Sequence, residues 1–132
     1  MDKIDQRNKR GIQVVHELFG AEQGAAYERT VASGAFGAKI GKMALEFMFA
    51  EVWGDATLEK KHRSMVTLGV LIALGRPEEI KQHIRAGLNN GLTVAEIEAI
   101  ILQAIPYAGF PSGKLAMQAA LAVFEERGIA VG

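Results

Sequence analysis

Apolar side chains recur along this chain every three or four residues, and no segment shows the alternating pattern of a β-strand. Glycine, proline and paired turn residues separate the apolar segments. The pattern predicts an all-α fold, a single-domain bundle of about six or seven helices. We expect these helices at about residues 2–18, 22–32, 36–53, 57–75, 77–89, 93–105 and 112–127.

Several residues mark where the helices begin and end. Thr57 is a candidate N-cap, and Pro77 stands where a first helical position belongs. The Asn-Asn-Gly sequence at residues 89–91 is typical of a left-handed C-cap. Thr93 and Glu96 have the spacing of a capping box, so they are expected to open the next helix.

Two segments depart from a simple amphipathic pattern. Residues 65–74 are apolar nearly all round, which is typical of a central or interface helix. Pro106, with the segment 107–111 after it, is expected to end the sixth helix, because proline lacks the N–H that a helix interior needs.

Composition narrows the possible partners. The 132 residues fit one domain, 1–132. Lys and Arg total 15, as do Asp and Glu, so we expect no nucleic acid and no anionic membrane as partner. An apolar content of 49% on a chain of zero formal charge predicts a homo-oligomer. The first ten residues lack the apolar core of a signal peptide, so we expect a cytoplasmic protein.

Familiar catalytic motifs are absent from the chain, including phosphate-binding glycine loops, nucleophile elbows and paired-histidine zinc helices. No cysteine is present, which excludes disulfides, thiol catalysis and thiolate metal sites. His16, His62 and His83 lie far apart in the sequence, so no metal site is expected.

Three groups of polar residues remain as candidates. Glu51 and Trp53 stand together at a helix end, and His62-Arg63-Ser64 opens the most apolar helix. An apolar wall beside Arg63 would strengthen its attraction for a carboxylate. The alternative is that residues 60–63 form a solvated charged face.

His83 forms the third group. It lies on the border of its helix's buried face, beside Gly87, where an imidazole is either half-buried structure or a proton donor at a cavity's edge. On the following helix, Glu96, Gln103 and Tyr107 share one stripe. The capping box accounts for Glu96, which leaves Gln103 and Tyr107 as pocket candidates.

The segment from Glu51 to Met117 resembles carboxymuconolactone decarboxylases, which belong to the alkylhydroperoxidase D-like superfamily. The residues that carry this resemblance are Glu51-Val-Trp53, Arg63-Ser-Met-Val-Thr67-Leu, Ala73-Leu-Gly75-Arg76, Glu79, His83, Asn90-Gly91-Leu-Thr93, Glu96-Ile97 and Tyr107-Ala-Gly109-Phe-Pro111. In the superfamily's thiol peroxidases, a Glu, a Cys-x-x-Cys and a His form the signature. Those positions hold Ser64, Arg76, Glu79 and His83 here, so thiol peroxidase activity is rejected.

The resemblance implies loss of CO₂ from 4-carboxymuconolactone, giving the enol-lactone of 3-oxoadipate in aromatic-compound catabolism. It implies no cofactor, since the conjugated carbonyl of the substrate is the electron sink, and a trimer or hexamer. We expect Arg63 to bind the carboxylate or lactone, His83 to deliver the proton and Glu51 to assist. The expected substrate-binding residues are Trp53, His62, Ser64, Gln103 and Tyr107.

Two positions differ from the family pattern. Typical decarboxylases have Trp-Ser-Arg-Pro-Gly-Leu where this chain has residues 53–58, so Asp55 replaces an arginine. Gln103 stands where the family often has a histidine, and His62 is the candidate to supply a basic group instead. These changes leave open a related cyclic substrate, or a non-catalytic oligomer that binds a small molecule.

Overall fold

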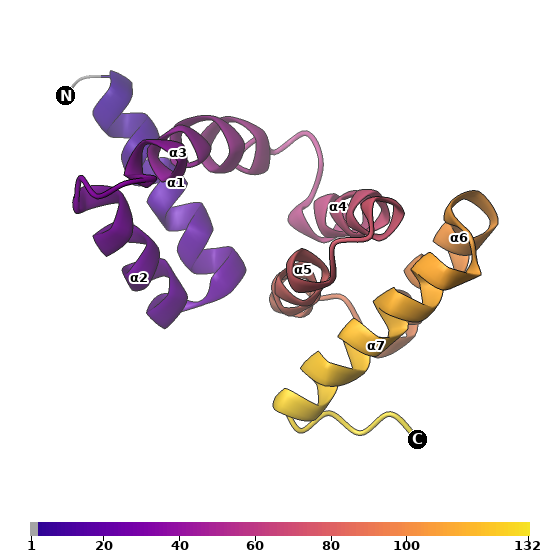
Figure 1. Ribbon diagram of the computed structural model, residues 1–132. Coiled ribbons are helices and arrows are strands. Elements are labelled where there is room, and N and C mark those ends of the chain that lie inside the picture. Colours follow the sequence, from indigo (N-terminus) through magenta and orange to yellow (C-terminus); the bar gives the residue numbers. More distant parts are fainter. Residues whose placement is uncertain (1–2) are drawn as a thin grey trace. The chain divides into compact units, whose positions relative to one another are not determined.

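The computed structural model describes residues 3–132, with side chains from Gln6 onward. This part of the chain is helical and contains no strand, which confirms the all-α prediction (Figure 1). The elements are α1 (Lys3–Phe19), α2 (Ala21–Ala32), α3 (Ala38–Met43), η1 (Ala44–Trp53), α4 (Lys60–Leu74), α5 (Pro77–Asn89), α6 (Val94–Ala108) and α7 (Phe110–Glu126). The expected start of the first helix, at Asp2, lies outside the described residues.

Two compact units divide the chain, one ending at Glu59 and the other beginning at Lys60. The first holds α1, α2, α3 and η1, and the second holds α4 to α7. That the whole chain acts as one domain stays a prediction.

The first unit is built around Phe49 of η1. Its ring makes edge-to-face contacts with Phe19 of α1 and Tyr27 of α2, at centroid distances of 5.9 and 5.8 Å. The Tyr27 hydroxyl donates to the Gly41 carbonyl at 2.6 Å, which fixes α2 against α3. Gly11 of α1 lies so close to the backbone of η1 that a Cβ there would collide with it.

The segment 38–53 is helical as predicted, but its second part has a different helix type. Residues 44–53 form a π-helix, whose backbone hydrogen bonds span five residues instead of four. Four large apolar residues of the segment 36–47 lie on the surface: Phe36, Ile40, Met43 and Phe47 are all exposed.

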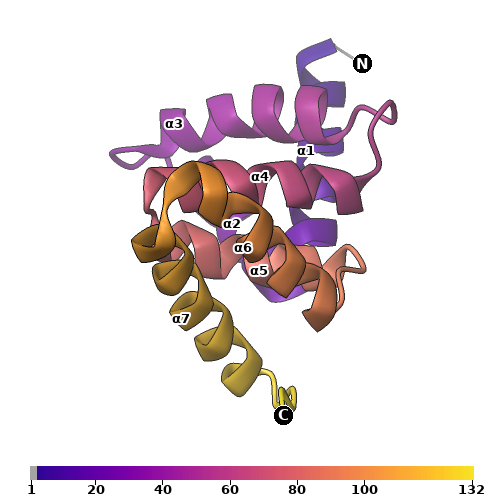
Figure 2. The same cartoon turned by 90° about the vertical axis from the view of Figure 1, so that its right-hand side faces the viewer.

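The second unit has one shared core to which all four of its helices contribute. Its buried members are Leu68, Ile72, Ile80, Ile84, Leu92, Ile97, Ile101, Ala116, Ala119, Ala120, Val123 and Phe124. Helices α6 and α7 pack against each other and are joined at Gly109, whose φ of 98° turns the chain back (Figure 2). Gly113 lets α7 approach Ile105 of α6 closely.

Three boundary predictions are confirmed. Pro77 begins α5. Gly91 follows that helix with φ 96°, the left-handed conformation that glycine adopts without strain. At the start of α6, the Glu96 N–H donates to Thr93 Oγ1 and the Thr93 N–H donates to Glu96 Oε1, both at 3.1 Å, so the capping box is complete.

Two other boundary predictions are wrong. Thr57 does not cap α4, because that helix begins at Lys60. The N–H of Thr57 instead donates to Asp55 Oδ1 at 2.7 Å in a turn that precedes the helix. Pro106 does not end α6, which continues to Ala108, because near a helix's C-terminus the loss of one hydrogen bond is tolerated. The break comes at Gly109 instead.

Candidate functional site

Helices α4 and α5 carry the two central candidate residues and form a hairpin. The start of α4 meets the end of α5, where Asn90 Nδ2 donates to the Ser64 hydroxyl at 2.9 Å. Ser64 is fully buried, and a Cβ on Gly87 would lie 3.7 Å from the Cβ of Ser64. Since a short turn joins the other ends of the two helices, they run antiparallel.

Helix geometry fixes the side of this hairpin to which each candidate belongs. Arg63 lies about 100° around α4 from Ser64, and His83 lies about 40° around α5 from Gly87. For antiparallel helices in contact at Ser64 and Gly87, both rotations lead to the same side. Within the second unit, Arg63 and His83 therefore project from neighbouring helices toward one side of the α4–α5 pair.

The environment of His83 decides its charge. The side chain is half-buried, and its Nδ1 is buried from solvent. Burial lowers the pKa of His83, because the imidazolium loses hydration, while the Glu79 carboxylate one turn earlier raises that pKa less strongly. The imidazole is accordingly neutral at pH 7.

Gln103 and Tyr107 line a different pocket, of about 460 Å³, between α4 and α6. Its α4 wall consists of Met65, Gly69 and Ala73. These three positions average about 120° around α4 from Arg63, so within one unit the pocket does not open on the Arg63 side.

Glu96 also lines this pocket, and it has two structural partners. Besides its hydrogen bonds in the capping box, Glu96 forms an ion pair in which Lys61 Nζ lies 3.0 Å from Glu96 Oε2. The hydrogen bond from Lys61, with those from Thr93, lowers the pKa of Glu96. These contacts agree with the capping role expected from the sequence.

The remaining candidates are spread over both units. Glu51 of η1 forms an ion pair with Arg7 of α1 at 2.8 Å, and Trp53 is buried at the end of η1. His62 is exposed in the first turn of α4. Glu51 and Trp53 belong to the first unit and His62 to the second.

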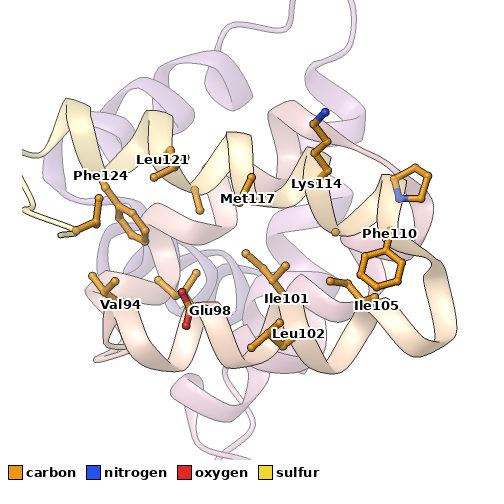
Figure 3. Close-up of a pocket in the computed structure, with 15 residues that line it drawn as sticks. Val94, Glu98, Ile101, Leu102, Ile105, Phe110, Lys114, Met117, Leu121 and Phe124 are labelled. Atoms are coloured by element: carbon orange, nitrogen blue, oxygen red, sulfur yellow. The ribbon is translucent and has the colours of Figure 1, made fainter.

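An apolar groove of about 770 Å³ lies between α6 and α7, and it was not among the predicted sites (Figure 3). Leu102, Phe110, Met117 and Leu121 line it and are exposed. None of the candidate site residues lines it. The sequence feature that could have indicated this groove is the set of apolar residues on the outer face of the two successive helices.

The described part of the chain shows neither a cluster of metal ligands nor a membrane-spanning helix. Residues 6–132, whose side chains the structure describes, bring no three His, Asp or Glu side chains together as metal ligands. Within the same residues, no helix combines the length and the apolar character that crossing a bilayer requires.

Comparison with known proteins gives three matches. The sequence profile of the Carboxymuconolactone decarboxylase family matches residues 38–126. A 4-carboxymuconolactone decarboxylase from Acinetobacter baylyi is 37% identical over 127 residues, which cover 96% of this chain and 92% of that protein. The nitrosuccinic acid decarboxylase npaB from Metarhizium robertsii is 39% identical over 67 residues, 51% of this chain and 47% of that protein.

Proposed function

This chain belongs to the carboxymuconolactone decarboxylase family, and we propose that it removes CO₂ from a carboxylated, unsaturated cyclic substrate without a bound cofactor. Both named relatives are decarboxylases. The observation that carries the proposal is the projection of Arg63 and His83 toward one side of the α4–α5 hairpin, with Ser64 and Asn90 bonded behind them.

In the proposed reaction, Arg63 binds an anionic oxygen of the substrate. The electron pair of the breaking C–C bond moves into the conjugated carbonyl of the substrate, which becomes an enolate while CO₂ leaves. The guanidinium also stabilises this oxyanion. Proton delivery to carbon by His83 then completes the product.

Because the pKa of His83 is lowered in the free protein, the imidazole must take up its proton when the substrate binds. The free imidazole is neutral at pH 7, but a bound carboxylate raises the pKa of a neighbouring histidine. His83 therefore takes up a proton when the anionic substrate binds and transfers it to carbon after CO₂ is lost. Glu51 orients or assists, and Trp53 walls the pocket.

We propose that the chain forms a homo-oligomer, a trimer or a hexamer, with its pockets near subunit contacts. Gln103 and Tyr107 line a pocket on another side of α4 from Arg63. In the proposed assembly, a neighbouring subunit supplies these two side chains to the site, while Ser64 holds the start of α4 in place and His62 adds positive charge at the rim.

The proposed substrate is 4-carboxymuconolactone, converted to the enol-lactone of 3-oxoadipate, or a related cyclic acid with fewer charges. The 37% identical relative supports the first choice. Asp55 supports the second, because an acidic residue stands where the family pattern has an arginine that could contact an anionic substrate.

The test is direct incubation of the purified protein with 4-carboxymuconolactone, followed by measurement of released CO₂ and of the loss of substrate absorbance. We expect turnover of this compound or of a less charged cyclic analogue. Nitrosuccinic acid, which is acyclic, serves as the comparison substrate. Binding of the lactones without CO₂ release would instead identify a non-catalytic small-molecule binder.

A further inference from the structure

A side chain from α1 reaches the end of η1, in the first unit. The two helices pack against each other, and Arg10 Nη2 donates to the Gly54 carbonyl oxygen at 2.5 Å. This carbonyl belongs to the peptide bond between Gly54 and Asp55. The contact therefore holds a guanidinium at the turn that directly follows Trp53, which is proposed to wall the substrate pocket.

Gly54 provides the space that this contact needs. A Cβ on Gly54 would lie 2.8 Å from Arg10 Nε and would collide with the Ala50 carbonyl oxygen of η1. The backbone of Gly54, with φ −78° and ψ −9°, suits any residue, so the glycine is required for room and not for its conformation. In the typical family pattern a serine stands at this position, followed by the arginine that Asp55 replaces.

The bond to Gly54 uses a small part of what the Arg10 side chain offers. A guanidinium carries five N–H donors in a planar fork, which matches the two oxygens of a carboxylate. Arg10 is exposed and forms no ion pair with residues 6–132, whereas Arg7, about one turn earlier on α1, is paired with Glu51. Arg10 is therefore fixed in place while its charge is still available to an anion.

The proposed reaction indicates which anion this is. The departing carboxylate becomes neutral CO₂, so a cation bound to it stabilises the substrate more than the transition state and slows the reaction. A carboxylate that remains in the product keeps its charge throughout, and a cation bound to it lowers KM without opposing the chemical step. Such a group is present in 4-carboxymuconolactone, because the enol-lactone formed from it still carries one carboxylate.

We infer that Arg10 binds the carboxylate that the substrate retains after CO₂ has left, and that it supplies the cation for which Asp55 is unsuited. The inference rests on the proposed function and narrows its substrate class. Arg10 is a specificity-determining residue, which selects a cyclic acid with a second carboxylate over one that carries only the departing group.

Fluorescence of Trp53 tests the assignment without turnover, because it is the chain's single tryptophan and adjoins Gly54. The probes are the product, the enol-lactone of 3-oxoadipate, and its methyl ester. Arg10→Ala should raise the Kd of the acid at least ~10-fold, the usual size of a hydrogen bond to a charged group, and leave the Kd of the ester unchanged. Lys9→Ala, which removes the same charge from the preceding exposed residue of α1, should change neither Kd.

Rescue and kinetics complete the test. The double variant Arg10→Ala/Asp55→Arg returns a guanidinium to the turn and should regain affinity for the acid. In CO₂ release from 4-carboxymuconolactone, Arg10→Ala should raise KM and keep kcat. Circular dichroism should show equal helix content in all variants.

Four results would overturn the inference: a wild type that binds neither probe, an unchanged Kd for the acid in Arg10→Ala, equal losses for acid and ester, or no recovery in a folded double variant. Equal losses would assign Arg10 a purely structural role at the end of η1. Failure of the proposed function is distinguishable, because Arg10-dependent binding of the acid by a wild type that releases no CO₂ would remove the decarboxylation and retain the assignment of Arg10.

Discussion

The imidazole of His83 couples protonation to folding. Because burial lowers its pKa in the folded protein, the unfolded chain binds the proton more tightly. The unfolding free energy should therefore fall as pH decreases from about 7 to about 5, through and below the ordinary histidine pKa. In His83→Gln this decline should be shallower, as measured by denaturant unfolding at each pH.

His62→Gln is the control for this measurement, since its side chain is exposed. It should keep the wild-type dependence of the unfolding free energy on pH. An equally steep decline in His83→Gln would show that the buried imidazole does not control it.

Residue type was enough to select the candidate site residues, but it did not predict which residues surround them. Ser64 was expected to bind substrate, and the structure buries it against Asn90. The spacing pattern gave Asn90 the role of a C-cap residue. Their contact joins residues 26 apart, so no local spacing contains it. The border position of His83, in contrast, follows from the spacing of its own helix.

At the scale of the element, the capping box of α6 offers a sharp comparison. Thr93→Ala removes the side-chain acceptor of the Glu96 N–H and should lower the unfolding free energy by about 1 kcal/mol. Thr57→Ala, at the predicted cap that does not begin a helix, should change it by less than about 0.5 kcal/mol. Equal losses in thermal or denaturant unfolding would contradict the structure here.

Two helical glycines should respond to alanine with opposite signs. A Cβ at Gly113 would lie 2.7 Å from Ile105 Cδ1, so Gly113→Ala should destabilise the protein by about 1–3 kcal/mol. Gly69 of α4 has open space around its Cβ position, and Gly69→Ala should stabilise by up to about 1 kcal/mol. Denaturant midpoints shifted in the same direction would refute the packing described for α6 and α7.

Element boundaries were predictable where a residue acts on its own backbone. Pro77 and Gly91 act locally, and both predictions are confirmed. The end of α6 was not predictable from Pro106, because packing against α7 outweighs one missing hydrogen bond. The π-helix at 44–53 leaves no clear mark either, since its apolar residues also fit an α-helical spacing.

At the scale of the whole molecule, the placement of Gln103 and Tyr107 predicts a site shared between subunits. Arg63→Ala and the double variant Gln103→Ala/Tyr107→Ala should each be impaired alone. Mixed oligomers of the two should regain activity, because about a quarter of neighbouring pairs then hold one intact site. Activity is measured after unfolding the two variants together and refolding them.

A mixture of Arg63→Ala with His83→Ala is the matched control. Both residues belong to the same α4–α5 hairpin, so no subunit combination rebuilds the site and activity should not return. Failure of the first mixture to regain activity would place Gln103 and Tyr107 outside the shared site.

The most direct test of the account is kcat/KM for CO₂ release from the turned-over lactone in Arg63→Ala and His83→Ala, with Arg29→Ala, at an exposed residue of α2, as control. We expect each site variant to lose at least ~100-fold, the usual size of one acid–base or electrostatic contribution, and the control to keep wild-type activity. Near-normal activity in a folded Arg63→Ala or His83→Ala protein would contradict the proposed chemistry.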